Sequence, residues 1–336
     1  MDNCTSLVLD STYLDTIVLR KVILMKVTQS FIHPLTQFEQ PVDKSLYLHS
    51  FITDYINRHQ LFGDVERYTK IIGLFMRLCC PSNVSYKGLD AVCMFTTLSF
   101  LIDDQADKDD IRYLEQYREI VKGVRTPASQ LEDALSELLD LVDDLSSRTQ
   151  TNSDLFRQLF LDYIAAQQWE RTYLNRSQGG FRLEDYLRYR PDAIALFPYL
   201  ALLKLSEEID ELQGHSLQKA QLLFLEQLAA RIAYLDNDIC SWEFERSDPT
   251  ALNLVKILKE EWTLSWNASL EEVMRTRDAT VKLYVCNRDY ALQVSDDASL
   301  KRYLTFIECS ITGNFETLRR LKLQRLRYEA TESLAA

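Results

Sequence analysis

Three polar residues recur at four-residue spacing in the second half of the chain: Asn237, Ser241 and Glu245. We call them the NSE trio. On a helix of 3.6 residues per turn they lie one above another on a single face. Their amide, hydroxyl and carboxylate oxygens are hard donors, which Mg²⁺ accepts while it also binds waters and substrate phosphates. The spacing predicts a magnesium-diphosphate site. The alternative is an ordinary solvated face, but the apolar residues around the trio favour a lined cavity.

A second acidic group follows a helix expected over about 88–104. The body of that helix is almost uniformly apolar, which indicates burial, and it ends in DDQADKDD. Asp103 and Asp107 lie one turn apart on one face, with Asp104 beside them. Carboxylates this close raise one another's pKa unless cations neutralise them, so the pattern favours a divalent metal. The alternative is an acidic, solvated helix end.

Two basic features could bind phosphate. Arg190 lies 47 positions before Asn237 and next to Pro191. An arginine at a helix junction can donate two parallel hydrogen bonds to phosphate oxygens, although a surface role is the common alternative. The chain also ends in a basic run that contains Arg327 and Tyr328. That run is either an amphipathic terminal helix or a segment that folds over the mouth of the site and binds an anion.

Composition limits the class of protein. The 336 residues include eight Gly and seven Pro and are 46% apolar, which predicts a nearly all-α protein with a substantial core. A net charge of -12 disfavours nucleic acid and anionic lipid as partners, and a polyanionic substrate would need metal ions as intermediaries. Seven scattered cysteines indicate reduced, mostly buried thiols and a cytoplasmic location. We expect no membrane span, and a homodimer is left open.

The pattern of apolar residues and helix breakers predicts the order of elements. An extended lead-in at about 31–42 precedes the first helix. Charged residues interrupt the apolar patch at 16–25, so it is neither a signal peptide nor a membrane span. We expect an irregularity near Ala193–Ala195 and a turn at Gly313-Asn314. The expected helices cover residues 44–59, 64–80, 88–104, two segments within 112–148, 153–175, 217–246, 259–290 and 296–312.

In this order the motifs resemble those of class I terpene synthases of the microbial single-domain type. DDQAD at 103–107 is similar to the family's DDxxD, and NDICSWEFE at 237–245 fits NDxxSxxxE without a substitution. YLRYR at 186–190 and NLV at 253–255 also resemble family segments. The two metal motifs lie 134 residues apart, and the resemblance extends from about residue 43 to 328.

The resemblance implies a single all-α bundle around an apolar cavity, with both metal motifs at its mouth. It divides the chain into a lead-in segment at 1–42, an α domain at 43–330 and a disordered tail at 331–336. It implies an enzyme that ionises a linear isoprenyl diphosphate, most commonly farnesyl diphosphate, and cyclises the carbocation to a terpene hydrocarbon or alcohol with release of diphosphate. Three Mg²⁺ ions are implied as cofactors, with Mn²⁺ as the alternative metal.

Roles for individual residues follow from the same resemblance. Asp103 and Asp107 would hold two metal ions and the NSE trio the third. Arg190 would sense the diphosphate, and the terminal pair Arg327 and Tyr328 would also bind it. The carbocation needs an apolar wall with negative aromatic faces, for which ordinary core packing is the alternative role. The candidates for that wall are Phe75, Phe100, Phe197 and Tyr199.

The sequence departs from the family at three places. Phe244 stands where the family often has Lys, the RY pair follows Gly313 by fourteen residues and without the usual Trp, and Ala193 and Ala195 stand where Thr and Gly are common. Two rival functions remain on sequence grounds. A chain-elongating prenyltransferase would carry a second aspartate-rich motif in place of NDxxSxxxE. An inactive, cyclase-like protein is the other.

Overall fold

The computed structural model describes residues 42–106, 112–149, 152–176, 182–209, 216–248 and 251–335. All of them belong to one compact unit, Gln37–Ala336. Within them, side chains are left undescribed at the helix ends 42–43, 104–106, 174–176, 216–218 and 323–335. The boundaries expected at residues 43 and 330 and the tail at 331–336 stay predictions.

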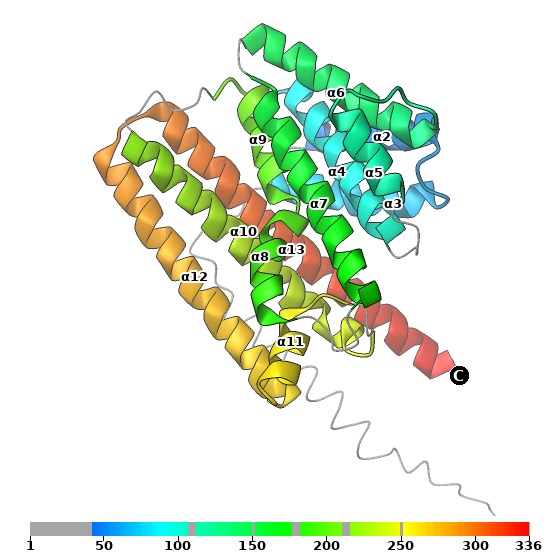
Figure 1. Ribbon diagram of the computed structural model, residues 1–336, viewed down its shortest axis with the longest axis vertical. Coiled ribbons are helices and arrows are strands. Elements are labelled where there is room, and N and C mark those ends of the chain that lie inside the picture. Colours follow the sequence, from blue (N-terminus) through cyan, green and yellow to red (C-terminus); the bar gives the residue numbers. More distant parts are fainter. Residues whose placement is uncertain are drawn as a thin grey trace, which may run out of the picture. The chain divides into compact units, whose positions relative to one another are not determined.

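The described residues form helices and no strand, so the predicted all-α fold class is confirmed (Figure 1). Their bounds agree with the expected helices within a few residues up to α10, whereas α12 begins at Trp266, seven residues after the expected start at 259. In chain order they are α2 (Val42–His59), α3 (Val65–Cys79), α4 (Tyr86–Ala106), α5 (Arg112–Val121), α6 (Gln130–Thr149), α7 (Asp154–Arg176), α8 (Leu183–Ala193), α9 (Leu196–Ser206), α10 (Ser216–Glu245), α11 (Leu254–Glu261), α12 (Trp266–Val294) and α13 (Ala298–Ala335).

Several helices begin at side chains that cap them. Asp64 accepts a hydrogen bond from the backbone N–H of Arg67 at the start of α3, and Ser265 accepts one from Ala268 at the start of α12. Each cap satisfies one of the N–H groups that a helix start leaves without an intrahelical partner. The start of α3 was accordingly predicted within one residue, whereas the start of α12 had been expected at about residue 259.

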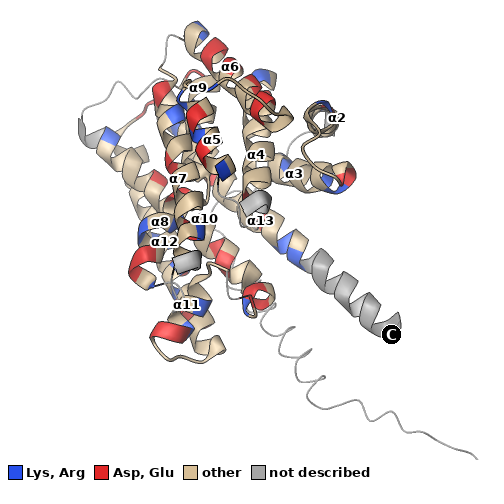
Figure 2. Ribbon diagram, turned by 45° about the vertical axis from the view of Figure 1, so that its right-hand side comes forward, with Lys and Arg blue, Asp and Glu red and all other residues tan. Residues whose placement is uncertain are grey.

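The apolar helix α4 lies within the core. Val92, Phe95 and Leu98 are buried, and α4 packs against α2, α6 and α9. By contrast, α6 buries one face and exposes an acidic one, and its acidic residues are prominent in Figure 2. None of the described helices has an apolar stretch long enough to cross a membrane.

A second group of long helices is built around α10, which packs against both α12 and α13. An ion pair crosses this contact, because Arg277 Nε on α12 donates to Asp236 Oδ1 on α10 at 2.9 Å. Both side chains are buried. The guanidinium also lies 5.8 Å from the ring centroid of Phe315 on α13, so one arginine contacts all three helices.

The chain breaks between α8 and α9 near the expected place. Pro191 lies inside α8, and the helix continues to Ala193. The break itself is at Ala195, whose φ of 60° and ψ of 12° are left-handed. For a residue with a Cβ atom, that conformation costs about 1–2 kcal/mol. The break turns the chain, so that α8 carries Arg190 and α9 supplies an inner wall.

The predicted turn at Gly313-Asn314 is wrong, because both residues lie inside the continuous helix α13. A Cβ atom at Gly313 would come within 2.2 Å of the carbonyl oxygen of Leu78. Glycine is therefore needed for the close approach of α13 to the end of α3 and does not mark a chain reversal. The local turn signal was overridden by tertiary packing.

Six cysteines lie in the described residues, and all six are free thiols. Five are buried, whereas Cys286 is exposed. Burial raises the pKa of the Cys80 thiol to about 12, so this thiol stays protonated at neutral pH. The pattern agrees with the expectation of buried, reduced cysteines.

Candidate active site

A cavity of about 230 Å³ opens among α3, α4, α7, α8, α9, α10 and α13. One part of its wall is aromatic. Phe75 lies in edge-to-face contact with Phe100, at 6.0 Å between ring centroids, and with Tyr199, at 6.5 Å. Three of the four predicted aromatic residues thus line one cavity.

The fourth aromatic candidate, Phe197, is not among the described residues that line this cavity. It is half-buried on α9, where Leu196 and Tyr199 face the cavity. Residues three apart share a helix face, and Phe197 is rotated away from that face by about 100°. The phase of α9 depends on which residue makes the break; the sequence predicts an irregularity at 193–195 but does not show that Ala195 is the left-handed residue.

Polar residues from three separate motifs also line the cavity. They are Asp103 at the end of α4, Arg190 on α8 and Asn237 on α10. Asp103 is exposed to solvent. Residues far apart in the sequence therefore meet around one cavity, as the family resemblance implied.

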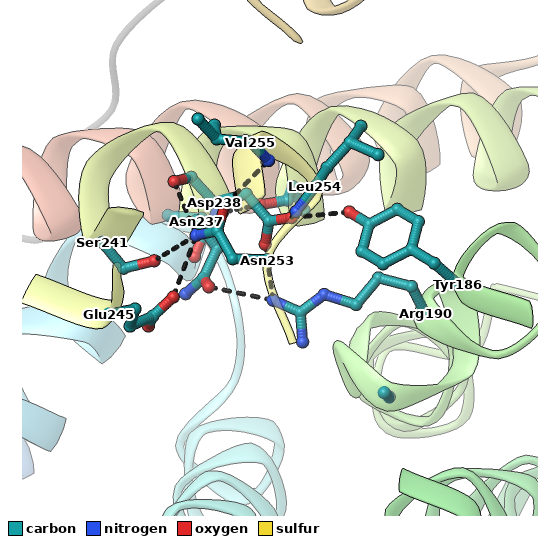
Figure 3. A network of polar contacts seen from close by, with 12 residues as sticks. Tyr186, Arg190, Asn237, Asp238, Ser241, Glu245, Asn253, Leu254 and Val255 are labelled. Carbon is teal, nitrogen blue, oxygen red and sulfur yellow. Dashed lines mark hydrogen bonds and ion pairs between the residues drawn. The ribbon is translucent and has the colours of Figure 1, made fainter. Parts of the chain in front are cut away.

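The NSE trio is cross-linked by a residue from the next helix. The amide nitrogen Nδ2 of Asn253 donates to Ser241 Oγ at 3.2 Å, to Glu245 Oε2 at 2.9 Å and to the main-chain oxygen of Asp238 at 3.0 Å (Figure 3). The Oδ1 atom of the same side chain accepts from the backbone N–H of Val255 and so caps α11. One asparagine thus sets the positions of two trio residues and of the helix start.

Arg190 is held against the same helix. Its Nη2 atom donates to Asn237 Oδ1 at 3.0 Å and to Asp238 Oδ1 at 2.9 Å (Figure 3). The other carboxylate oxygen of Asp238 accepts from the Tyr186 hydroxyl and from the Leu254 backbone N–H, each at 2.7 Å. Asp238 is fully buried, and its charge is balanced by these three donors.

The pKa values of the charged residues in the site are shifted by burial, and hydrogen bonds and opposite charges act against these shifts. Burial raises the pKa of Asp238, although Arg190 and the hydrogen bonds from Leu254 and Tyr186 oppose the shift. Burial likewise raises the pKa of Glu245, against a lowering by Asn253. Burial disfavours the charge on Arg190, but Asp238 and other neighbours raise its pKa above the ordinary value. Arg190 is therefore charged at any pH at which the protein folds.

Glu170 on α7 also belongs to this region. Burial raises its pKa to about 7, Arg190 lowers it, and Asp103 and Asp238 raise it. The carboxyl group of Glu170 thus interacts electrostatically with one residue of each motif segment, Asp103 and Asp238. Its titration near neutral pH makes it a functional candidate.

The oxygens of the NSE trio fit a hard divalent metal. In the described residues no three His, Cys, Asp or Glu side chains cluster in a way that could hold a metal, so a site here must use amide and hydroxyl oxygens as well. Asn253 donates to Ser241 Oγ and Glu245 Oε2, which orients both atoms as acceptors. Oxygen donors of mixed charge, fixed by hydrogen bonds, are the ligands that Mg²⁺ takes together with water and phosphate.

Some predicted site residues lie beyond what the structure describes. Asp107 lies outside the described residues, and so do the side chains of Arg327 and Tyr328 on α13. Phe244 occupies the position where the family often has Lys. The neighbouring Glu243 forms an ion pair with Lys322 of α13, at 3.1 Å between Oε2 and Nζ.

Sequence reasoning missed four residues that shape the site. Tyr186, Asp238 and Asn253 all lie inside the motif segments quoted above. Their polar side chains within those motifs were the available signal that they support the site. Glu170 has no such signal, because it comes near the site only through the packing of α7 on α8.

Comparison with known proteins decides the family. Residues 94–282 match the model of terpene synthase family 2, C-terminal metal binding. The chain belongs to terpene synthase family 2. It is therefore a class I terpene synthase, a metal-binding lyase that acts on an isoprenyl diphosphate. The resemblance seen in the sequence is confirmed.

Solved structures support the same fold. This terpene synthase is similar to the SVS_A2 protein from ancestral sequence reconstruction, with a TM-score of 0.70, 18% identity, and coverage of 85% of this chain and 88% of that one. It is also similar to linalool/nerolidol synthase from Streptomyces clavuligerus, with a TM-score of 0.68, 19% identity, and coverage of 86% and 99%.

A third similar structure is hedycaryol synthase in complex with nerolidol, with a TM-score of 0.67, 18% identity, and coverage of 87% and 98%. At such low identity these likenesses show the fold alone. A search among curated protein sequences found no match.

Proposed function

We propose that this terpene synthase is a metal-dependent cyclase that ionises farnesyl diphosphate and cyclises the resulting carbocation with release of diphosphate. One observation carries the proposal: Arg190 Nη2 is bonded to Asn237 and Asp238 at the mouth of a cavity with an aromatic wall. A phosphate-binding donor thus lies directly beside oxygen donors suited to metal. The choice of farnesyl diphosphate follows the family's commonest substrate.

Three Mg²⁺ ions, with Mn²⁺ as the alternative, would be held by Asp103 and Asp107 on one side and by the NSE trio on the other. When bound, they supply positive charge that stabilises the diphosphate leaving group as the allylic C–O bond breaks. The trio's part is to present three oxygens in fixed positions. Asn253 limits the freedom of two of them before any metal arrives.

Arg190 would bind the diphosphate, and Asp238 holds the Arg190 side chain in place. Its Nε atom is buried and has no hydrogen-bond partner among the described residues. That N–H is therefore a donor left for a ligand oxygen, since a buried donor without a partner is costly. Arg327 and Tyr328 are proposed as further diphosphate ligands on the basis of the family resemblance.

The aromatic wall would guide the cation. The ring faces of Phe75, Phe100 and Tyr199 offer negative electrostatic potential to a positively charged carbon. Their packing in a cavity also limits the access of bulk water to the reactive cation.

Product analysis tests the proposal. The protein would be incubated separately with geranyl, farnesyl and geranylgeranyl diphosphates and Mg²⁺, and the products identified by gas chromatography–mass spectrometry. We expect a cyclic product from farnesyl diphosphate that disappears when a chelator is added. Asn237→Ala should abolish it and leave the helical circular-dichroism spectrum unchanged.

Other outcomes would point to the rivals. Full activity of Asn237→Ala would defeat the metal assignment. Longer diphosphates formed when isopentenyl diphosphate is added would indicate a prenyltransferase. No turnover of any diphosphate by folded protein would indicate an inactive, cyclase-like protein.

A further inference from the structure

The cavity wall carries more polar atoms than the folding of a hydrocarbon chain requires. Five side chains with an aliphatic hydroxyl or an amide line it from the two helices α4 and α13. They are Thr96, Ser99, Ser310, Asn314 and Thr317. Cavities for apolar ligands usually place a small number of polar groups where they contact something specific.

Three of these hydroxyl groups have already used their only hydrogen atom. Ser99, Ser310 and Thr317 each donate to a main-chain carbonyl three or four residues earlier in the same helix, at 2.9, 2.8 and 2.8 Å. A hydroxyl has one hydrogen and two lone pairs. Toward the cavity these oxygens can therefore only accept hydrogen bonds, so they favour a donor such as water.

Thr96 differs from the other three. Its side chain is buried, at 2% exposure, and its Oγ1 atom has no hydrogen-bond partner among the described residues. Leaving a buried hydroxyl unsatisfied costs about 1–3 kcal/mol. Because Thr96 lines the cavity, the contents of the cavity are the natural source of a partner. The cavity of about 230 Å³ has room for a water molecule, which needs about 10–15 Å³ of such space.

We propose that Thr96 holds a water molecule in this cavity and that this water captures the carbocation, so that the main product is an alcohol. The inference rests on the proposed function, which supplies the cation. A water that donates its hydrogens to accepting oxygens such as that of Ser310 keeps a lone pair for the cation. Thr96 is a positioning residue for that water.

The step balances without a further reagent. The lone pair of the water oxygen forms a C–O bond to the cationic carbon, which gives a protonated alcohol. One O–H bond of that group then breaks, and the proton passes to an oxygen of the released diphosphate. No oxidation or reduction takes place.

Labelled water tests the inference. The protein and farnesyl diphosphate would react with Mg²⁺ in H₂¹⁸O, and the products would be separated by mass spectrometry into alcohols and hydrocarbons. We expect mainly an alcohol that carries ¹⁸O. Thr96→Val exchanges the hydroxyl for a methyl group and should lower the ratio of alcohol to hydrocarbon at least tenfold. Reactions with chelator measure uncatalysed hydrolysis, which is subtracted.

Thr312→Val is the matched control. Thr312 lies on α13 and, like Thr96, is buried. It is not among the described cavity-lining residues, and its hydroxyl donates to the carbonyl of Glu308. This variant should keep the wild-type product ratio. If Thr96→Val does not fold, Ser310→Ala is measured in its place and should lower the ratio as well.

The outcomes separate this inference from the function on which it rests. Hydrocarbon alone from the wild type, unlabelled alcohol, or an unchanged ratio in Thr96→Val would overturn the role of water and leave the cyclase assignment intact. No product from any diphosphate would overturn both.

Discussion

The NSE trio and Asp103, the described residue of the aspartate-rich motif, lie in opposite surroundings. The NSE trio lies on a buried helix, where Asn253 cross-links it and the Arg190–Asp238 pair flanks it. Asp103 lies exposed at the end of α4. A buried carboxylate must be paired, whereas water can solvate an exposed one. The NSE trio is thus held by buried hydrogen bonds, whereas Asp103 lies in contact with solvent.

The largest expected effect would come from a change on the buried side. Asp238→Leu leaves the Arg190 charge buried without its carboxylate, which should lower the free energy of unfolding by about 3–5 kcal/mol. Product formation should be lost as well. Urea unfolding followed by circular dichroism measures the first, and product analysis the second.

Asp103→Asn is the counterpart on the exposed side. It should change the free energy of unfolding by less than about 0.5 kcal/mol, as surface substitutions usually do, while product formation falls. Equal destabilisation by the two variants would show that the contrast between the two motifs is wrong.

A smaller effect is expected when the cross-link is removed from the trio. Asn253→Ala should weaken the apparent affinity for Mg²⁺ about 10–100-fold, because it removes the hydrogen bonds that orient Ser241 and Glu245. Product formation measured against Mg²⁺ concentration reports this change.

Asn253→Ser separates the two roles of this asparagine. Serine can still cap α11, so most of the loss in folding stability from a missing cap, about 1 kcal/mol, should be avoided. It lacks the amide donor, so the Mg²⁺ affinity should stay low. Recovery of the affinity in Asn253→Ser would mean that the cap, and not the cross-link, matters for metal binding.

The smallest expected effect concerns Glu170, whose pKa is raised by both Asp103 and Asp238. Its pKa of about 7 lies above the ordinary value of 4.5, so its contribution to stability is fully present below about pH 4.5 and is lost as the pH rises through 7. Glu170→Gln removes this dependence. We compare the free energy of unfolding of the variant with that of the wild type. The difference, variant minus wild type, should increase by on the order of 1 kcal/mol from pH 5 to pH 8.

Two controls sharpen this measurement. The exposed Glu260→Gln should show no such gain. In an Asp103→Asn background the pH dependence should move to lower pH, because one carboxylate that raises the pKa of Glu170 has been removed. A pH dependence that stays the same in Glu170→Gln would contradict the assignment.

Residues on one helix, and motifs at helix ends, could be predicted from the sequence. The spacing of the NSE trio identified it because helical periodicity is local. The placement of Arg190 beside Asn237 followed from the family motifs. The roles of Asn253 and Asp238 could not be assigned, because they depend on how α8, α10 and α11 pack together.

The errors have the same origin. Gly313 carries a local signal for a turn, but its contact with Leu78 exists only once α3 and α13 are packed. Phe197 and Tyr199 are equally aromatic in the sequence, and the left-handed Ala195 decides which of them faces the cavity. Such choices depend on tertiary structure, which local propensity does not contain.

The missing Cβ atom at Gly313 also bears on motion. Because the Leu78 carbonyl meets α13 where only glycine fits, a slide of α13 by one turn would bring Cys309 or Thr317 against that carbonyl, and either side chain would clash. The register of α13 against α3 is therefore fixed at this contact, and a one-turn slide between the two helices is blocked.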